Sequence, residues 1–101
     1  MKVVYHTEYG SFSISKECAE WMADRGNVEC AQMLERGEFY GYLHDTPRHD
    51  ILLNMAVEAL GITQCGENLA VHELKGDRYY IDEYDGHESI VEPHNIEWVV
   101  V

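Results

Sequence analysis

The dipeptide Asp85-Gly86 constrains the fold of this chain more than any other feature of its sequence. It lies between residues 78–84 and 87–92, two short runs that contain aromatic and β-branched side chains. An Asp-Gly pair between such runs is typical of a β-hairpin, because both residues tolerate the positive φ angles of a tight turn. The pair therefore predicts two antiparallel strands in the last third of the chain.

Three further runs of apolar, β-branched and aromatic residues are predicted strands, namely residues 2–9, 69–74 and 96–101. The predicted helices all lie between the first of these strands and the others. Such segregation is typical of the α+β class, here a mostly antiparallel sheet of about five strands packed against two or three helices. Apolar residues make up 46% of the 101 residues, which is enough for one compact domain spanning 1–101.

Helices are predicted where apolar side chains recur at helical spacing, at residues 16–25, 28–36 and 48–60. Each is preceded by a side chain that can cap a helix: Ser15, Asn27 and the pair Asp45-Thr46, with Pro47 at the first position of the third helix. The aromatic run 39–43 fits either a short strand or a packed loop. Residues 63–68 are predicted to form a polar turn.

The net charge restricts the partners that the chain can bind. Seven Lys and Arg residues stand against 19 Asp and Glu residues, which gives a formal charge of −12. Because like charges repel, this excess argues against direct binding to nucleic acid or to an anionic membrane. It favours a basic protein surface as the partner.

Cysteine usage and hydropathy indicate a soluble protein of the cytoplasm. The three cysteines are an odd number without a Cys-x-x-Cys spacing, which fits reduced thiols better than disulfides. No apolar run approaches the ~20 residues of a membrane span, and the amino terminus lacks the apolar stretch of a signal peptide.

The predicted hairpin carries the densest group of candidate binding residues. The residues predicted to contact a partner are Tyr80, Asp82, Glu83, Tyr84, Asp85 and Glu88. Tyrosines are frequent anchors in interfaces, and carboxylates attract a basic surface. A solvated hairpin face without a binding role is the alternative interpretation.

The sequence leaves the register of this hairpin open. A two-residue turn would place Glu83 opposite Glu88, a repulsive pair that a cation or a basic partner could neutralise. A three-residue turn with a glycine bulge would place Glu83 opposite His87, an attractive pair when the imidazole is charged.

A second group of residues predicts a small-molecule site for a nucleotide-like ligand, formed by Tyr40, Tyr42, Arg48 and His49. Tyrosine rings stack on flat ligands, and backbone N–H groups at a helix start favour anions. The segment 44–50 lacks the spacing of a metal site, so Asp45 and Thr46 are interpreted as capping residues.

No catalytic residue, cofactor or metal site is predicted. The motifs GxSxG, GxGxxG and the P-loop do not occur in the chain. Cys65 is expected to be exposed in its polar turn, but no neighbour in sequence supplies the base that a nucleophile needs. A metal-dependent or cysteine enzyme is therefore the third alternative, after a binding protein and a small-molecule binder.

The apolar residues 96–101 fit two arrangements. They fit an inner strand of the core, or an exposed edge strand that pairs with a partner or with a second copy of the chain to make a homodimer.

Three blocks of the sequence resemble a family of small uncharacterised proteins that recur in bacteriophage genomes. The blocks are KVVYHTEYGSFSIS, TPRHDILLNMAVEALG and LAVHELKGDRYYIDEYDGHESIVEPHNIEW, the last with a Tyr-Asp-Gly turn. The chain departs from the family pattern at Ser11, where a second glycine is usual, and in an insertion-like stretch around 26–42. The resemblance implies expression inside a bacterial host cell and a host or phage protein as the partner, and it assigns no catalytic residue.

Overall fold

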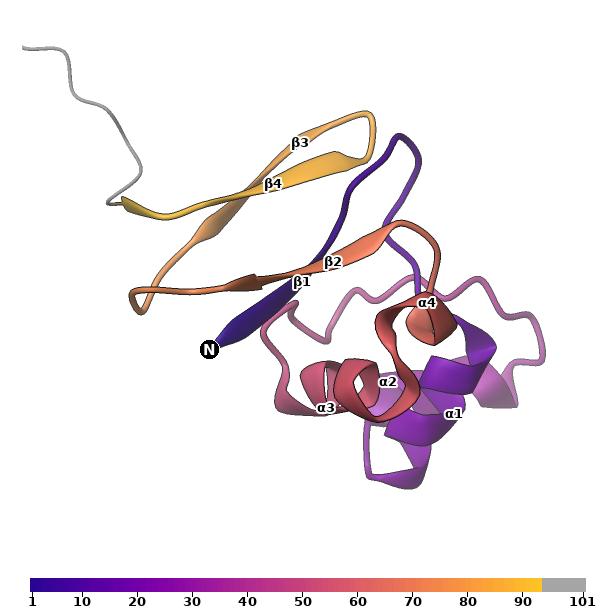
Figure 1. The fold of residues 1–101 in the computed structure, drawn as a ribbon. Coiled ribbons are helices and arrows are strands. Elements are labelled where there is room, and N and C mark those ends of the chain that lie inside the picture. The colour runs from indigo at the N-terminus through magenta and orange to yellow at the C-terminus, as the bar shows by residue number, and fades with distance from the viewer. Residues whose placement is uncertain (94–101) are drawn as a thin grey trace, which may run out of the picture.

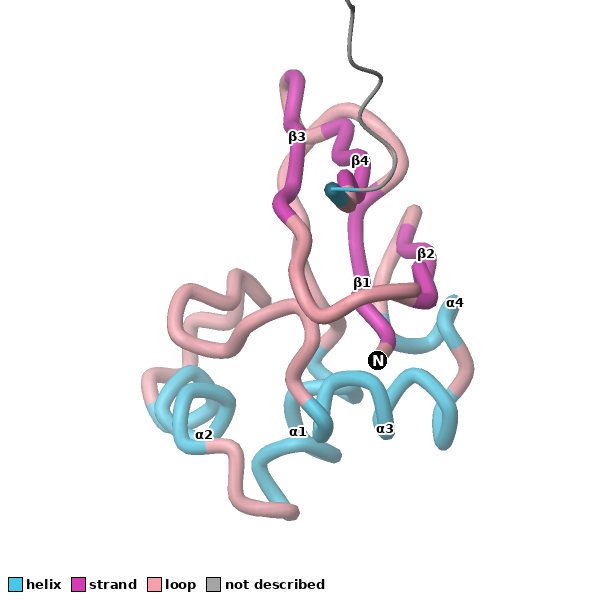
Figure 2. The backbone as a smooth tube through the Cα atoms, turned by 90° about the vertical axis from the view of Figure 1, so that its left-hand side faces the viewer, coloured by secondary structure: helices cyan, strands magenta, loops and turns pink. Residues whose placement is uncertain are grey.

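The computed structural model describes residues 1–93 of the chain, so the strand predicted at 96–101 lies outside the described residues. In chain order the elements are β1 (Lys2–His6), α1 (Lys16–Asp24), α2 (Val28–Glu35), α3 (Ile51–Leu60), α4 (Ile62–Cys65), β2 (Leu69–Glu73), β3 (Tyr80–Tyr84) and β4 (His87–Val91). The helices form one layer and the strands lie over it (Figures 1 and 2). The predicted α+β class is confirmed.

The single five-stranded sheet is not confirmed. Within residues 1–93 the strands form two antiparallel ladders of two strands each, β1 with β2 and β3 with β4. In the hairpin, Asp85 and Gly86 have φ angles of 50° and 89°, as a two-residue turn of the hairpin type requires. The register places Glu83 opposite Glu88, which selects the first of the two predicted arrangements.

The first two helices begin where the sequence predicts them. The Ser15 hydroxyl accepts a hydrogen bond from the Cys18 N–H at 3.1 Å, and the Asn27 side chain accepts one from the Cys30 N–H at 2.8 Å. Each side chain thereby satisfies a donor that the first turn of a helix leaves unpaired.

The third helix begins at Ile51 and not at Arg48, so the predicted cap at Asp45-Thr46 is wrong. Asp50 caps it instead, by accepting from the Leu53 N–H at 3.0 Å. The Arg48 carbonyl is already taken by the Val4 N–H of β1, at 3.0 Å. This hydrogen bond ties residue 48 to the edge of β1, so the helix starts only after the cap at Asp50.

The core lies between the helices and β1. Its fully buried side chains come from every helix and from β1, and they include Val4, Cys18, Met22, Cys30, Leu53, Ala56 and Cys65. Cys65 was predicted to be exposed, but residues 62–65 form α4, whose single turn brings the thiol into the core. A hydrogen bond with Cys65, together with burial, raises the pKa of the Cys18 thiol, so this sulfur stays protonated.

The hairpin is attached to β1 without a regular ladder. Beyond the Arg48 carbonyl, the outer edge of β1 meets the carboxylate of Glu88, which accepts from the His6 N–H at 2.8 Å. Further along, the Gly10 N–H donates to the Asp85 carbonyl at 2.8 Å. A side-chain carboxylate therefore takes the place that a backbone carbonyl of β4 would hold in a continuous sheet.

Arg48 also binds the carboxylate of Glu88. Its guanidinium donates two hydrogen bonds to Glu88, at 2.6 and 2.9 Å, and its Cζ atom lies 3.6 Å from the centre of the Phe12 ring. Only 18% of the Arg48 side chain and 6% of the Glu88 side chain are exposed. This is a paired, nearly buried charge with its hydrogen bonds satisfied, the form in which proteins tolerate burial of a charge.

A second buried carboxylate fixes the other end of β4. Glu92 accepts from the backbone N–H of Lys75 at 2.8 Å and lies 2.8 Å from Nε2 of His72 on β2. Glu88 and Glu92 stand four positions apart, one within β4 and one just after it. Two glutamates thus attach the β4 segment to the first sheet.

Gly86 allows the closest approach of the hairpin to the loop after β1. A Cβ atom at this position would lie 1.1 Å from the Gly10 carbonyl oxygen, and the φ angle of 89° is itself unfavourable for other residues. We expect Gly86→Ala to lower the free energy of unfolding by at least ~2 kcal/mol, measured by urea denaturation. Gly76→Ala is the control, because a Cβ there meets no atom within 4 Å. Equal stabilities of the two variants would contradict this packing.

Candidate functional site

The hairpin presents one face to solvent, with aromatic and acidic side chains on it. Alternation along β3 places Tyr80, Asp82 and Tyr84 on the same face, and Tyr84 is 73% exposed. Tyr9, from the loop after β1, meets Tyr84 and His87 edge-on, with ring centres 6.5 and 6.0 Å apart. Segments more than 70 positions apart in sequence therefore build one aromatic cluster.

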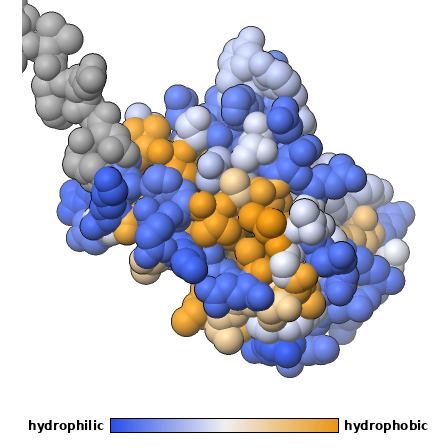
Figure 3. All heavy atoms as spheres, in the orientation of Figure 1, coloured by the Kyte–Doolittle hydropathy of each residue, from blue (hydrophilic) through white to orange (hydrophobic). Residues whose placement is uncertain are grey.

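We call this surface the hairpin tip and define it as Tyr9, Tyr80, Asp82, Glu83, Tyr84, Asp85 and His87. In the space-filling view its side chains are hydrophilic to neutral, whereas hydrophobic side chains gather lower on the molecule, toward the helices (Figure 3). Five of the six residues predicted to contact a partner belong to the hairpin tip. Sequence reasoning missed Tyr9, because no local pattern connects it to the hairpin.

Glu88, the sixth predicted contact residue, is not available to a partner. It is buried, and both of its oxygens bind Arg48. Arg48 is thus the cation that neutralises Glu88 and relieves its repulsion with Glu83. Arg48 was predicted to belong to the small-molecule site. Glu88 and Arg48, one residue from each predicted site, therefore bind each other and stabilise the fold.

The remaining carboxylates of the hairpin tip carry uncompensated charge. Across the described residues 1–93, Asp82, Glu83 and Asp85 take part in no ion pair. The Glu83 carboxylate accepts only the Gly86 N–H, at 3.1 Å. Since Arg48 is consumed by Glu88, the negative field at the hairpin tip extends into solvent.

The residues of the second predicted site lie around the loop between α2 and α3. Tyr40 and Tyr42 lie together in this loop, with ring planes inclined by 6° and ring centres 6.5 Å apart. Tyr42 and Arg48 line one cleft, together with Glu83 and Glu88 of the hairpin. Tyr40 and His49 do not line this cleft, and Nδ1 of His49 is 2.7 Å from the hydroxyl of Tyr79. A single small-molecule site that includes all four side chains stays a prediction.

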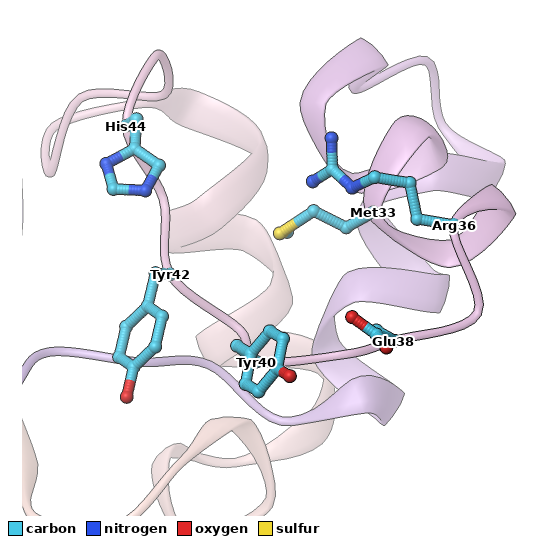
Figure 4. Close-up of a pocket in the computed structure, with 6 residues that line it drawn as sticks. All are labelled: Met33, Arg36, Glu38, Tyr40, Tyr42 and His44. Atoms are coloured by element: carbon cyan, nitrogen blue, oxygen red, sulfur yellow. The ribbon is translucent and has the colours of Figure 1, made fainter.

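A different set of residues surrounds the two tyrosines. They line a pocket of about 150 Å³, which we call the loop pocket: Met33, Arg36, Glu38, Tyr40, Tyr42 and His44. In Figure 4 the Met33 thioether points between the tyrosines and the two basic side chains, Arg36 and His44. Arg36 could not be found from sequence, because it ends a helix that the loop folds back toward.

The loop that carries the tyrosines is held by one carboxylate. Glu29 on α2 accepts from the backbone N–H groups of His44, Asp45 and Thr46, at 2.6, 2.9 and 2.9 Å. Asp45 and Thr46 thus donate backbone N–H groups to Glu29. Burial opposes ionisation of Glu29, but these hydrogen bonds to the charged form outweigh it and lower the pKa of the carboxyl.

Residues 1–93 contain no group of three or more His, Cys, Asp or Glu side chains that could hold a metal ion. In the same residues no helix is long and apolar enough to cross a bilayer. No protein-family model, curated protein or solved structure matches the chain. Function must therefore be argued from the two surfaces themselves.

The lowered pKa of Glu29 makes the loop sensitive to acid. A carboxyl whose pKa is depressed in the folded state contributes stability above its unfolded pKa of ~4.3, and that contribution is lost as the pH falls through the folded value. We expect the amide resonances of residues 44–46 to shift toward unbonded values on acidification below about pH 4. Glu29→Gln should remove this step, whereas Glu35→Gln, at the exposed end of α2, should leave it. An unchanged step in Glu29→Gln would contradict the assignment.

Proposed function

We propose that the protein is a non-enzymatic binding protein that docks its hairpin tip on a basic surface of another protein. The observation that carries the proposal is the exposed aromatic cluster Tyr9, Tyr84 and His87, bordered by carboxylates that have no cation of their own. The protein would act by occupying the partner's surface, which inhibits any activity that depends on that surface.

The aromatic part of the hairpin tip suits an anchor. Tyr9 and Tyr84 are 67% and 73% exposed, although tyrosine rings gain free energy when they are buried. Their edge-on contact holds both rings in place before a partner arrives, which lowers the entropy lost on binding. Tyrosines of this kind are enriched among the residues that contribute most to interface affinity.

The acidic side chains of the hairpin tip determine the charge that a partner surface must carry. Asp82 shares the exposed face of Tyr80 and Tyr84, Asp85 lies in the turn, and Glu83 lies on the opposite face, across from Glu88. None of the three takes part in an ion pair within residues 1–93, so a positively charged surface would gain from contact and a negatively charged one would be repelled. Charge pairs at the rim of an interface mainly accelerate association, and salt screens them over about 8 Å at physiological ionic strength. Binding should therefore weaken as salt is added.

The test compares two variants of equal net charge. In the tip variant, Asp82→Asn, Glu83→Gln and Asp85→Asn remove three charges; Asn tolerates the positive φ of position 85. In the control variant, Asp24→Asn, Glu35→Gln and Glu67→Gln remove three exposed charges elsewhere. Because the sequence resembles a bacteriophage family, partners are first captured from bacterial lysate and identified by mass spectrometry.

Affinity for the purified partner is then measured by calorimetry at low and high salt. We expect the tip variant to bind about tenfold or more weakly at low salt and to lose most of its salt dependence, with the control close to wild type. Tyr84→Ala should weaken binding by about fivefold or more at either salt concentration. Equal losses in the tip and control variants would refute the hairpin tip as the site.

A further inference from the structure

The loop pocket has the form of a small-ligand site. Its two tyrosines are exposed by 67% and 44%, and the Met33 thioether points into the space between the rings and the two basic side chains (Figure 4). Tyr42 and His44 also line the neighbouring cleft, which Glu83 of the hairpin tip borders. The volume of about 150 Å³ is close to that of a cavity that holds one benzene ring. The pocket is thus the size of a single six-membered ring.

The two tyrosines offer parallel ring faces to a flat ligand. Their planes are inclined by 6°, and the ring centres are 6.5 Å apart, within the 4.5–7 Å range of paired aromatic rings. A flat aromatic ring can stack on such a pair.

The backbone keeps this spacing fixed. Tyr40 and Tyr42 flank Gly41, whose carbonyl accepts from the Ile14 N–H at 2.9 Å and whose missing side chain would meet the Ile14 carbonyl oxygen at 2.1 Å. On the other side, Glu29 binds three successive backbone N–H groups. The tyrosines therefore lie on a loop that is anchored at both ends, which favours a preformed site.

The charged side chains around Tyr40 and Tyr42 indicate which group a bound aromatic ring would carry. The guanidinium of Arg36 and the imidazole of His44 lie on the side of the pocket opposite the tyrosine rings (Figure 4). Arg36 takes part in no ion pair within residues 1–93, so its donors are free for a ligand. Glu38 lines the same pocket, and its charge opposes an anion.

We propose that Tyr40 and Tyr42 stack on a single flat aromatic ring that bears an anionic group, and that Arg36 and His44 bind the anion. A pyrimidine nucleotide and an aromatic carboxylate share this chemistry. The two sources differ in the distance between ring and charge, so separate probes distinguish them. The loop pocket and the hairpin tip are tested with different variants, so either proposal can fail without the other.

The test is an NMR titration of the full chain with four probes: uridine monophosphate, uridine, 4-hydroxybenzoate and inorganic phosphate. We expect shifts confined to residues 36–44, with at least one anionic aromatic probe binding about tenfold more tightly than uridine or phosphate. Uridine monophosphate as the tighter probe identifies a nucleotide site, and 4-hydroxybenzoate as the tighter probe identifies a carboxylate site.

Variants test the two parts of the site separately. Tyr40→Ala should weaken binding of the tighter probe by about tenfold or more, and Tyr40→Phe should restore it, because stacking needs the ring and not the hydroxyl. Arg36→Gln should weaken binding, and Glu38→Gln should strengthen it. Lys16→Gln, an exposed charge on α1, is the control for Arg36→Gln.

Three results would overturn the inference. The first is the absence of shifts at residues 36–44 with every probe at millimolar concentration. The second is equal binding by Tyr40→Ala and wild type in variants whose circular dichroism and melting temperature match. The third is tighter binding by Arg36→Gln than by Glu38→Gln, which would mean that the pocket prefers a cation.

Discussion

The carboxylate of Glu88 holds two parts of this molecule together that share no regular sheet. It accepts from the His6 N–H on the edge of β1, and it binds both terminal nitrogens of Arg48, which packs on Phe12. Removing water from a charge costs several kcal/mol, so a buried carboxylate persists only when such partners are in place. The placement of the hairpin depends on this set of contacts.

The positions of the hairpin tip and of the loop pocket both depend on the contacts of Glu88. With Glu88 turned inward, the opposite face of the hairpin, with Tyr80, Asp82 and Tyr84, faces solvent. Arg48 pairs with the hairpin, and its carbonyl accepts a hydrogen bond from β1, so α3 begins at Ile51 and residues 48–50 extend the loop that follows α2. That loop, fixed by a second carboxylate at Glu29, carries Tyr40 and Tyr42. The protein thus uses buried carboxylates where a larger domain would use a continuous sheet.

The sequence predicted the features that depend on neighbouring residues. The Asp85-Gly86 turn and the caps at Ser15 and Asn27 are local, and each is present as expected. The predictions from sequence were wrong where the structure depends on contacts between residues that are distant in sequence. Glu88 and Arg48 are 40 positions apart, and nothing near either one marks their pairing. The start of α3 and the burial of Cys65 were missed for the same reason, because each is set by contacts with remote segments.

A double-mutant cycle at Arg48 and Glu88 tests most directly whether this pair holds the hairpin. The free energy of unfolding is measured by urea denaturation for wild type, Arg48→Met, Glu88→Gln and the double variant. Each single change should cost about 3–5 kcal/mol, because it leaves the other partner buried without compensation, and the double change should cost at least ~2 kcal/mol less than the sum. Additivity within ~0.5 kcal/mol would show that the two residues act independently and would contradict the account.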